Sequence, residues 1–138
     1  MIVSFDTNVL VYAMAPAAAE KKRRALELIT RGMRGGRSVL LLQTLAEFCN
    51  VTLRKAKLSV GEVRVALDAW RAVLPVHAAH QDDLPAALEV VKAHRLAFWD
   101  AVLWATARRV GVRRLLTEDM QDGKRMGALT IRNPFLAA

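Results

Sequence analysis

The chain has 138 residues, which suits a single domain able to bury roughly two-thirds of the surface that its unfolded form exposes. Its 21 Lys and Arg residues against 13 Asp and Glu residues give a net charge of +8, which favours a polyanionic or acidic partner. The single cysteine, Cys49, excludes a disulfide framework within the chain.

The first residues and the apolar runs bear on where the protein works. MIVSFDTNVL lacks the basic start and the small-residue cleavage site of a signal peptide. The longest apolar runs are interrupted well before the roughly 18 residues that a membrane span needs. We therefore expect a cytoplasmic protein that does not enter a membrane.

The first half of the chain alternates strand-like and helix-like segments. MIVSF, residues 1–5, is short, apolar and rich in β-branched and aromatic side chains, and SVLLL, residues 38–42, has the same character. Between them, residues 17–36 carry apolar side chains at helical spacing and end in glycine, which predicts a helix. Two further helices are expected, from Thr44 to about Lys57 and from an N-cap at Ser59 to about Ala72.

The second half continues the alternation. VLPV, residues 73–76, is a weak third strand that Pro75 restricts to a sheet edge. The other expected elements are a helix capped by Asp82 or Asp83, a helix over residues 97–111, and strands over residues 113–117 and 129–134. This order predicts an α/β domain whose central, mostly parallel sheet of about four to five strands is covered by helices on both faces.

Four acidic residues are expected at one edge of this sheet. Asp6 follows the first strand, and Glu47 lies in the first turn of the helix after the second. Asp119 follows the fourth strand, and Asp100 lies at the start of the helix leading into that strand. Because the carboxyl ends of parallel strands and the N-termini of the helices that follow them share one edge, these four acids should lie close together.

Structural roles also exist for these acids. Asp6 can cap a helix TNVLVYA, Glu47 completes the S/T-x-x-E pattern of a capping box, and Asp119 suits a turn in TEDMQDGK. Asp100 differs because it interrupts a nearly unbroken apolar stretch, where a charge should be paired, capped or bound to a cation. The aromatic side chains of Trp70, Phe98, Trp99 and Trp104 have a helical spacing more typical of core packing than of base stacking.

Crowded carboxylates repel one another and take up protons unless a cation neutralises them. Oxygen donors without His or Cys favour a hard ion, Mg²⁺ or Mn²⁺. Such an ion, bound by few carboxylates and several waters, suits phosphoryl chemistry. The residues therefore predict an acidic, metal-binding pocket in a basic protein, able to cut a polyanion.

The chain resembles the PIN-domain family and, more narrowly, the VapC toxins of type II toxin–antitoxin systems. The matching segments are FDTNVLVY, LAEF, HRLAFWDAVLWATA and LLTEDMQDGKRMGALTIRNPF, which together span nearly the whole sequence. The resemblance assigns the catalytic and metal-binding roles to Asp6, Glu47, Asp100 and Asp119, with Thr7, Asn8 and Thr117 as supporting polar residues. The choice between Glu118 and Asp119 as the fourth acid stays open.

The resemblance implies that residues 1–138 form one PIN-like three-layer α/β/α nuclease domain. Its activity would be that of a Mg²⁺- or Mn²⁺-dependent endoribonuclease that leaves 5′-phosphate and 3′-hydroxyl ends. It also implies a homodimer and a cognate VapB-like antitoxin whose tail covers the acidic pocket.

Basic residues bear on how RNA would be held. Residues 20–37 contain seven basic and two acidic side chains, a net charge of +5 (seven minus two). Lys21, Lys22, Arg23 and Arg24 are therefore candidates for contacts to the RNA backbone. A solvated helix face explains each of them equally well. A rival hypothesis for the whole chain is a non-catalytic basic α/β module that binds nucleic acid or a partner protein and uses its acids as caps.

Overall fold

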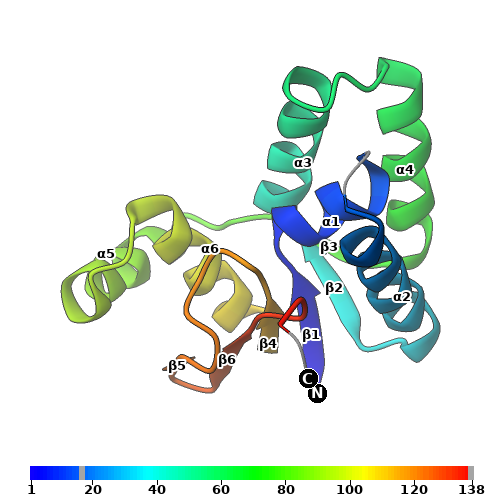
Figure 1. Cartoon of the computed structure of the whole chain (residues 1–138). Helices are drawn as coiled ribbons and strands as arrows, with labels where there is room; N and C mark the ends of the chain where they lie inside the picture. The colour runs from blue at the N-terminus through cyan, green and yellow to red at the C-terminus, as the bar shows by residue number, and fades with distance from the viewer. Residues whose placement is uncertain (16–17, 137–138) are drawn as a thin grey trace.

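A six-stranded sheet forms the centre of the computed structural model, which describes residues 1–15 and 18–136. The strands lie in the order β3-β2-β1-β4-β6-β5 (Figure 1). Neighbouring strands are parallel, except that β5 runs antiparallel to β6. The strands are β1 (Ile2–Phe5), β2 (Ser38–Leu41), β3 (Val76–His77), β4 (Val112–Leu116), β5 (Arg125–Met126) and β6 (Leu129–Arg132). The predicted mostly parallel sheet is confirmed.

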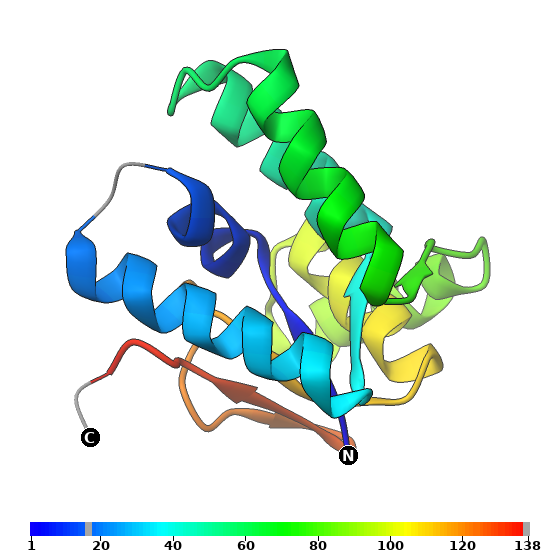
Figure 2. The same ribbon diagram turned by 90° about the vertical axis from the view of Figure 1, so that its right-hand side faces the viewer.

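Helices lie on both faces of the sheet (Figures 1 and 2). They are α1 (Thr7–Met14), α2 (Ala19–Gly35), α3 (Leu42–Arg54), α4 (Val60–Val73), α5 (Asp83–His94) and α6 (Phe98–Arg109). α5 and α6 cover one face, and α1 and α2 lie on the other. α3 and α4 form a hairpin that extends beyond the carboxyl ends of the strands. The three-layer α/β/α prediction is therefore confirmed.

Alternating side chains of the strands fill two apolar cores. In β2, Val39 and Leu41 belong to the core under α5 and α6, whereas Leu40 belongs to the core under α1 and α2. In β4, Leu115 and Leu116 divide in the same way. A strand buried on both faces is mostly apolar, which is why β2 is apolar in sequence after its first residue, Ser38.

Some predicted boundaries were wrong. α4 continues to Val73 and is capped at Leu74, so β3 begins only at Val76, although it does lie at a sheet edge as predicted. The two-residue β5 was not expected. It forms where the chain reverses at Gly127, whose φ of 63° suits glycine.

The prediction of core packing is confirmed for the buried Trp70 and Trp104, but it failed for Phe98 and Trp99 at the start of α6. Phe98 is 39% exposed and Trp99 is 65% exposed. Residue 17 of the predicted second helix and residues 137–138 of the predicted domain lie outside the described residues. Every helix within 1–15 and 18–136 is too short or too polar to span a lipid bilayer.

Candidate active site

Asp6 links the end of β1 to the start of α1. Its backbone N–H donates to the carbonyl oxygen of Leu116 at 2.8 Å, which extends the pairing of β1 with β4 up to the site. Asp6 is the N-cap of α1, and its Oδ1 accepts a hydrogen bond from the Thr7 N–H at 2.8 Å. Its Oδ2 accepts a hydrogen bond from the Thr117 hydroxyl at 2.8 Å. The capping role is therefore real, and it leaves one carboxylate oxygen directed at the loop after β4.

Thr117 and Asn8 fix Asp6 relative to Asp119. The fully buried Thr117 hydroxyl accepts hydrogen bonds from Asn8 Nδ2 and from the Asp119 N–H, both at 3.1 Å. Asn8 Nδ2 also donates to Asp119 Oδ2 at 3.1 Å. Asn8 and Thr117, two of the three residues predicted as supporting, thus join segments more than a hundred residues apart in the sequence.

Glu47 reaches the same region from α3. It accepts hydrogen bonds from the Thr7 hydroxyl at 2.9 Å and from Gln43 Nε2 at 3.4 Å. α3 begins at Leu42, so Thr44 lies inside the helix and is not its N-cap. The capping-box explanation for Glu47 is therefore wrong. Glu47 lies in the second turn of α3, not in the first turn as predicted. Thr44 Oγ1 is buried and has no hydrogen-bond partner among the described residues.

Asp100 lies in the first turn of α6 and is half-buried. Gln43 Nε2 donates to the carbonyl oxygen of Trp99 at 3.1 Å, which joins the start of α6 to α3. Burial raises the pKa of Asp100, and repulsion from Glu47 and Asp119 raises it further. Asp100 therefore lies within the electrostatic reach of two of the other predicted acids.

Burial also dominates the electrostatics of Asp6, which is only 7% exposed. Burial raises its pKa from 3.8 to about 6, against the opposing hydrogen bonds from Thr7 and Thr117, and repulsion from Glu47 and Asp119 adds to the increase. Glu47 and Asp119 therefore act electrostatically on both Asp6 and Asp100. A cation would relieve this repulsion.

The donor set suits a hard divalent ion that keeps much of its water. A hollow of about 310 Å³ is lined by Thr7, Asn8, Tyr12, Glu47 and Asp119, among others. In the part of the chain that the structure describes, no three Asp, Glu, His or Cys side chains are grouped closely enough to hold one ion directly. Mg²⁺ characteristically binds through one or two carboxylates and several waters, and it does not need a closed cage of protein ligands. The oxygen donors of this site fit that mode of binding.

Glu118 and Asp119 point in different directions. Glu118 accepts hydrogen bonds from Tyr12 Oη at 2.5 Å and from Lys21 Nζ at 2.6 Å. Burial alone would raise the pKa of Glu118, but the bonds from Lys21 and Tyr12 hold it below its usual range. Asp119 instead contacts Asn8 within the acidic network. The geometry favours Asp119 as the fourth acid.

Three of the four basic side chains predicted to hold RNA have partners within the protein. Lys21 pairs with Glu118, and Arg23 pairs with Glu20 at 3.0 Å. Arg24 Nε donates to the carbonyl oxygen of Pro134 at 3.2 Å. Lys22 is half-buried. These four residues do not form one free basic patch, so their predicted role remains a prediction.

Two residues of the network were not singled out from the sequence. Tyr12 and Gln43 each lie four residues from a predicted site residue, Asn8 and Glu47 respectively, on the same helix. Residues four apart share a helix face, so this spacing is the signal that could have identified them.

The sequence matches the PIN domain over residues 3–125. No curated protein matches the chain significantly. Among solved structures, a toxin–antitoxin complex from Klebsiella pneumoniae is similar, with a TM-score of 0.71 and 17% identity, covering 96% of this chain and 98% of that chain.

Two further solved structures have the same fold. VapBC2 from Rickettsia felis, bound to a DNA fragment from its promoter, has a TM-score of 0.68 and 20% identity over 96% of this chain and 98% of that chain. VapC20 from Mycobacterium tuberculosis, a toxin that cleaves the sarcin–ricin loop, has a TM-score of 0.64 and 18% identity over 82% of this chain and 86% of that chain. With the matched sequence pattern covering most of its length, this chain belongs to the PIN-domain family.

Proposed function

We propose that the protein is a divalent-metal-dependent endoribonuclease and a VapC-like toxin of a toxin–antitoxin pair. One observation carries the proposal: Asp6, Glu47, Asp100 and Asp119 come from four distant segments to one edge of the sheet, where Glu47 and Asp119 repel the charges of both Asp6 and Asp100. Fold stability alone does not require four such carboxylates together, and their mutual repulsion opposes it. The PIN-domain match and the similarity to solved VapC structures support the same activity.

Each acid has a distinct part in the proposed site. Asp6 and Asp119 are held by Thr117 and Asn8, so their spacing is set before any ligand binds. Glu47 is oriented by Thr7. Asp100 lies on a separate helix and contributes negative charge from the other side. When bound, Mg²⁺ or Mn²⁺ would neutralise phosphate oxygens and lower the pKa of a coordinated water.

The partners proposed for this chain follow from its relatives. Solved relatives include complexes with an antitoxin and a toxin that cleaves RNA. We therefore propose RNA as substrate and a VapB-like antitoxin as inhibitor, and from the family resemblance we also propose a homodimer. RNA cleavage inside the cell would place the protein in the cytoplasm.

Cleavage of total RNA by the purified protein tests the proposal. We expect cleavage with Mn²⁺ and none with EDTA, and no cleavage by Asp100→Asn prepared identically. Asp82→Asn, an exposed acid outside the site, is the matched control and should cleave like the wild type. Equal RNA patterns for the wild type and Asp100→Asn would instead favour the non-catalytic basic module.

A further inference from the structure

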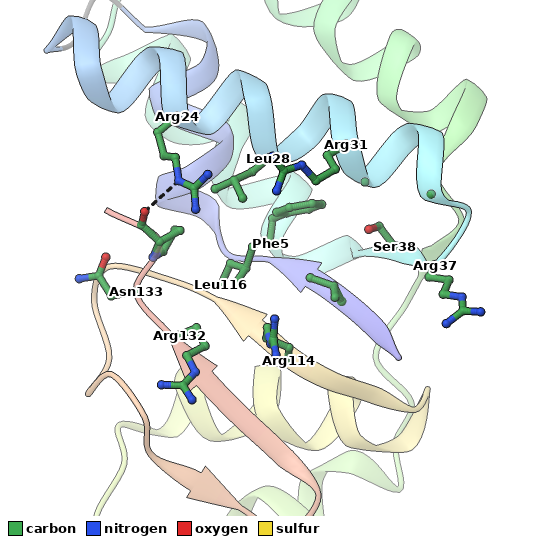
Figure 3. A pocket seen from close by; sticks show the side chains of 14 residues that line it. Phe5, Arg24, Leu28, Arg31, Arg37, Ser38, Arg114, Leu116, Arg132 and Asn133 are labelled. Carbon is green, nitrogen blue, oxygen red and sulfur yellow. Dashed lines mark hydrogen bonds between the residues drawn. The ribbon is translucent and has the colours of Figure 1, made fainter. Parts of the chain in front are cut away.

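A second hollow, larger than the one beside the acids, lies between α2 and the sheet (Figure 3). Its volume is about 510 Å³. Arg24 and Arg31 extend from α2 toward the strands, and Phe5 and Leu116 lie between them and the sheet. Gly32 of α2 also lines the hollow, and a Cβ there would come within 2.9 Å of the Phe5 ring. This space is large enough for a nucleotide.

The lining is strongly basic. No Asp or Glu is among the described residues that line it. Five arginines do line it: Arg24, Arg31, Arg37, Arg114 and Arg132. Glu27 lies nearby and pairs with Arg31 at 2.8 Å and with Arg24 at 3.7 Å. One carboxylate cannot balance five guanidinium groups, so the hollow has a net positive charge and attracts anions.

Arg114 and Arg132 are unusual because they are exposed side chains of internal strands. They project from β4 and β6 on the face that α2 covers only in part. A sheet face under a helix is ordinarily apolar. Two arginines there create a site in which planar guanidinium groups can bind phosphate oxygens above an apolar floor.

This hollow is linked to the proposed catalytic site by two shared lining residues and then by one side-chain contact. Arg24 and Pro134 also line a neighbouring hollow that contains Lys21. Lys21 Nζ contacts Tyr12 Oη at 3.3 Å, and Tyr12 lines the hollow that contains Asp119. Three hollows therefore follow one another along α1 and α2, and a single strand could contact both ends of the series.

We infer that the arginine-lined hollow binds a nucleotide of the RNA strand away from the cleaved bond, with its phosphate on Arg114 and Arg132 and its base or ribose against the half-buried side chains of Val3 and Leu28. This inference rests on the proposed function. It names a second RNA contact site that is separate from the four acids. An acidic protein tail is the competing occupant, but it would not explain the continuity with a site that handles phosphodiesters.

Binding of RNA under non-cleaving conditions tests the inference. The probe is a fluorescein-labelled oligouridylate of about 12 nucleotides, which spans more than one contact site. Its anisotropy is measured with EDTA over a series of NaCl concentrations, and a denaturing gel verifies that the RNA stays intact. The wild type is compared with Arg114→Gln/Arg132→Gln and with the control Arg64→Gln/Arg71→Gln on α4, which removes the same charge from an exposed helix.

The inference predicts that the Arg114/Arg132 variant binds roughly tenfold more weakly than the control variant. It also predicts that the dependence of log affinity on log salt becomes shallower by about 1.4, or ~0.7 for each lost phosphate contact. Arg37→Gln, an exposed change at the far end of the hollow, should weaken binding in the same direction. Thermal melting of each variant verifies that it is folded.

Equal affinities for the two double variants would overturn the inference, because only net charge would then matter. Binding of labelled polyglutamate that needs Arg114 and Arg132, with RNA binding unchanged, would also overturn it and assign the hollow to an acidic protein partner. The outcome is independent of catalysis. A failure of metal-dependent RNA cleavage would count against the proposed function. A binding affinity that does not depend on Arg114 and Arg132 would count against this inference alone.

Discussion

The Thr117 hydroxyl is the point at which the acidic network is held together. It is fully buried, donates to Asp6 and accepts from Asn8 and from the Asp119 backbone. Thr117→Val keeps the shape but removes all three bonds, so we expect the free energy of unfolding in urea to fall by about 1–3 kcal/mol. Thr117→Ser keeps the hydroxyl and should lose less. A valine variant as stable as the wild type would contradict this role.

Asp6 should make metal-free stability depend on pH. Its pKa is about 6 in the folded protein against 3.8 in the unfolded chain. Between these values the folded state binds more protons, so the free energy of unfolding should fall as pH rises from about 4 to 7, by up to about 3 kcal/mol.

Urea unfolding in EDTA can isolate this effect. Asp6→Asn has no proton to bind at this position, so it should not lose stability in this way. As pH rises, the free energy of unfolding of Asp6→Asn should therefore increase relative to that of the wild type. If the pH profiles of the two proteins run parallel between pH 4 and 7, the burial of the Asp6 charge does not have this consequence.

The sequence predicted four site acids but left the choice between Glu118 and Asp119 as the fourth open. The two side chains are adjacent, and only the backbone of the loop after β4 decides which one faces the other acids. Lys21 and Tyr12, which hold Glu118 away, lie about a hundred residues earlier in the sequence. A partner that distant leaves no local pattern at Glu118 itself.

At the scale of elements, a buried carboxylate joins α5 to α6. Asp83 is 2% exposed and accepts hydrogen bonds from the Arg109 Nε at 2.8 Å and from the Thr106 hydroxyl at 2.9 Å. Burial alone would raise the pKa of Asp83, but Arg109, the His80 N–H and Thr106 hold it below its usual range. The sequence predicted only a cap from Asp82 or Asp83. Asp82 occupies the N-cap position of α5, as predicted, but without a side-chain cap bond, and Asp83 forms a link between the two helices.

Removing this carboxylate should loosen the helix pair. We expect Asp83→Ala to lower the free energy of unfolding by about 2–3 kcal/mol, less than for a fully buried pair because the Arg109 side chain is 40% exposed. Asp82→Ala, one residue earlier and without a side-chain cap bond, should change it by less than about 0.5 kcal/mol. Similar losses for the two variants in thermal or urea unfolding would show that the Asp83 contacts are not responsible.

Most elements were predictable because their signals are local. Ser59 caps α4 and forms a capping box with Glu62, as its sequence pattern indicates. β3 and β5 were misplaced or missed because two-residue strands are defined by their neighbours in the sheet. Trp99 was misassigned because helical spacing gives the face of a side chain but not whether another element covers that face.

At the scale of the whole molecule, negative and positive groups are separated. The acids gather at the carboxyl ends of β1 and β4, while the arginines line the face beneath α2. This arrangement suits a protein that draws in a polyanion with one surface and acts on it with another. The parallel topology accounts for the acidic site, because only such a sheet brings the ends of β1, β2 and β4 to one edge.

The most direct test of the account is whether Asp119, and not Glu118, belongs to a divalent-cation site. Mn²⁺ is titrated into wild type, Asp119→Asn and Glu118→Gln, and free Mn²⁺ is read by electron paramagnetic resonance. Both variants remove one negative charge from adjacent positions. We predict that wild type and Glu118→Gln bind Mn²⁺ with similar affinity and that Asp119→Asn binds it at least about tenfold more weakly. Absence of Mn²⁺ binding to the wild type, or a greater loss in Glu118→Gln than in Asp119→Asn, would contradict the account.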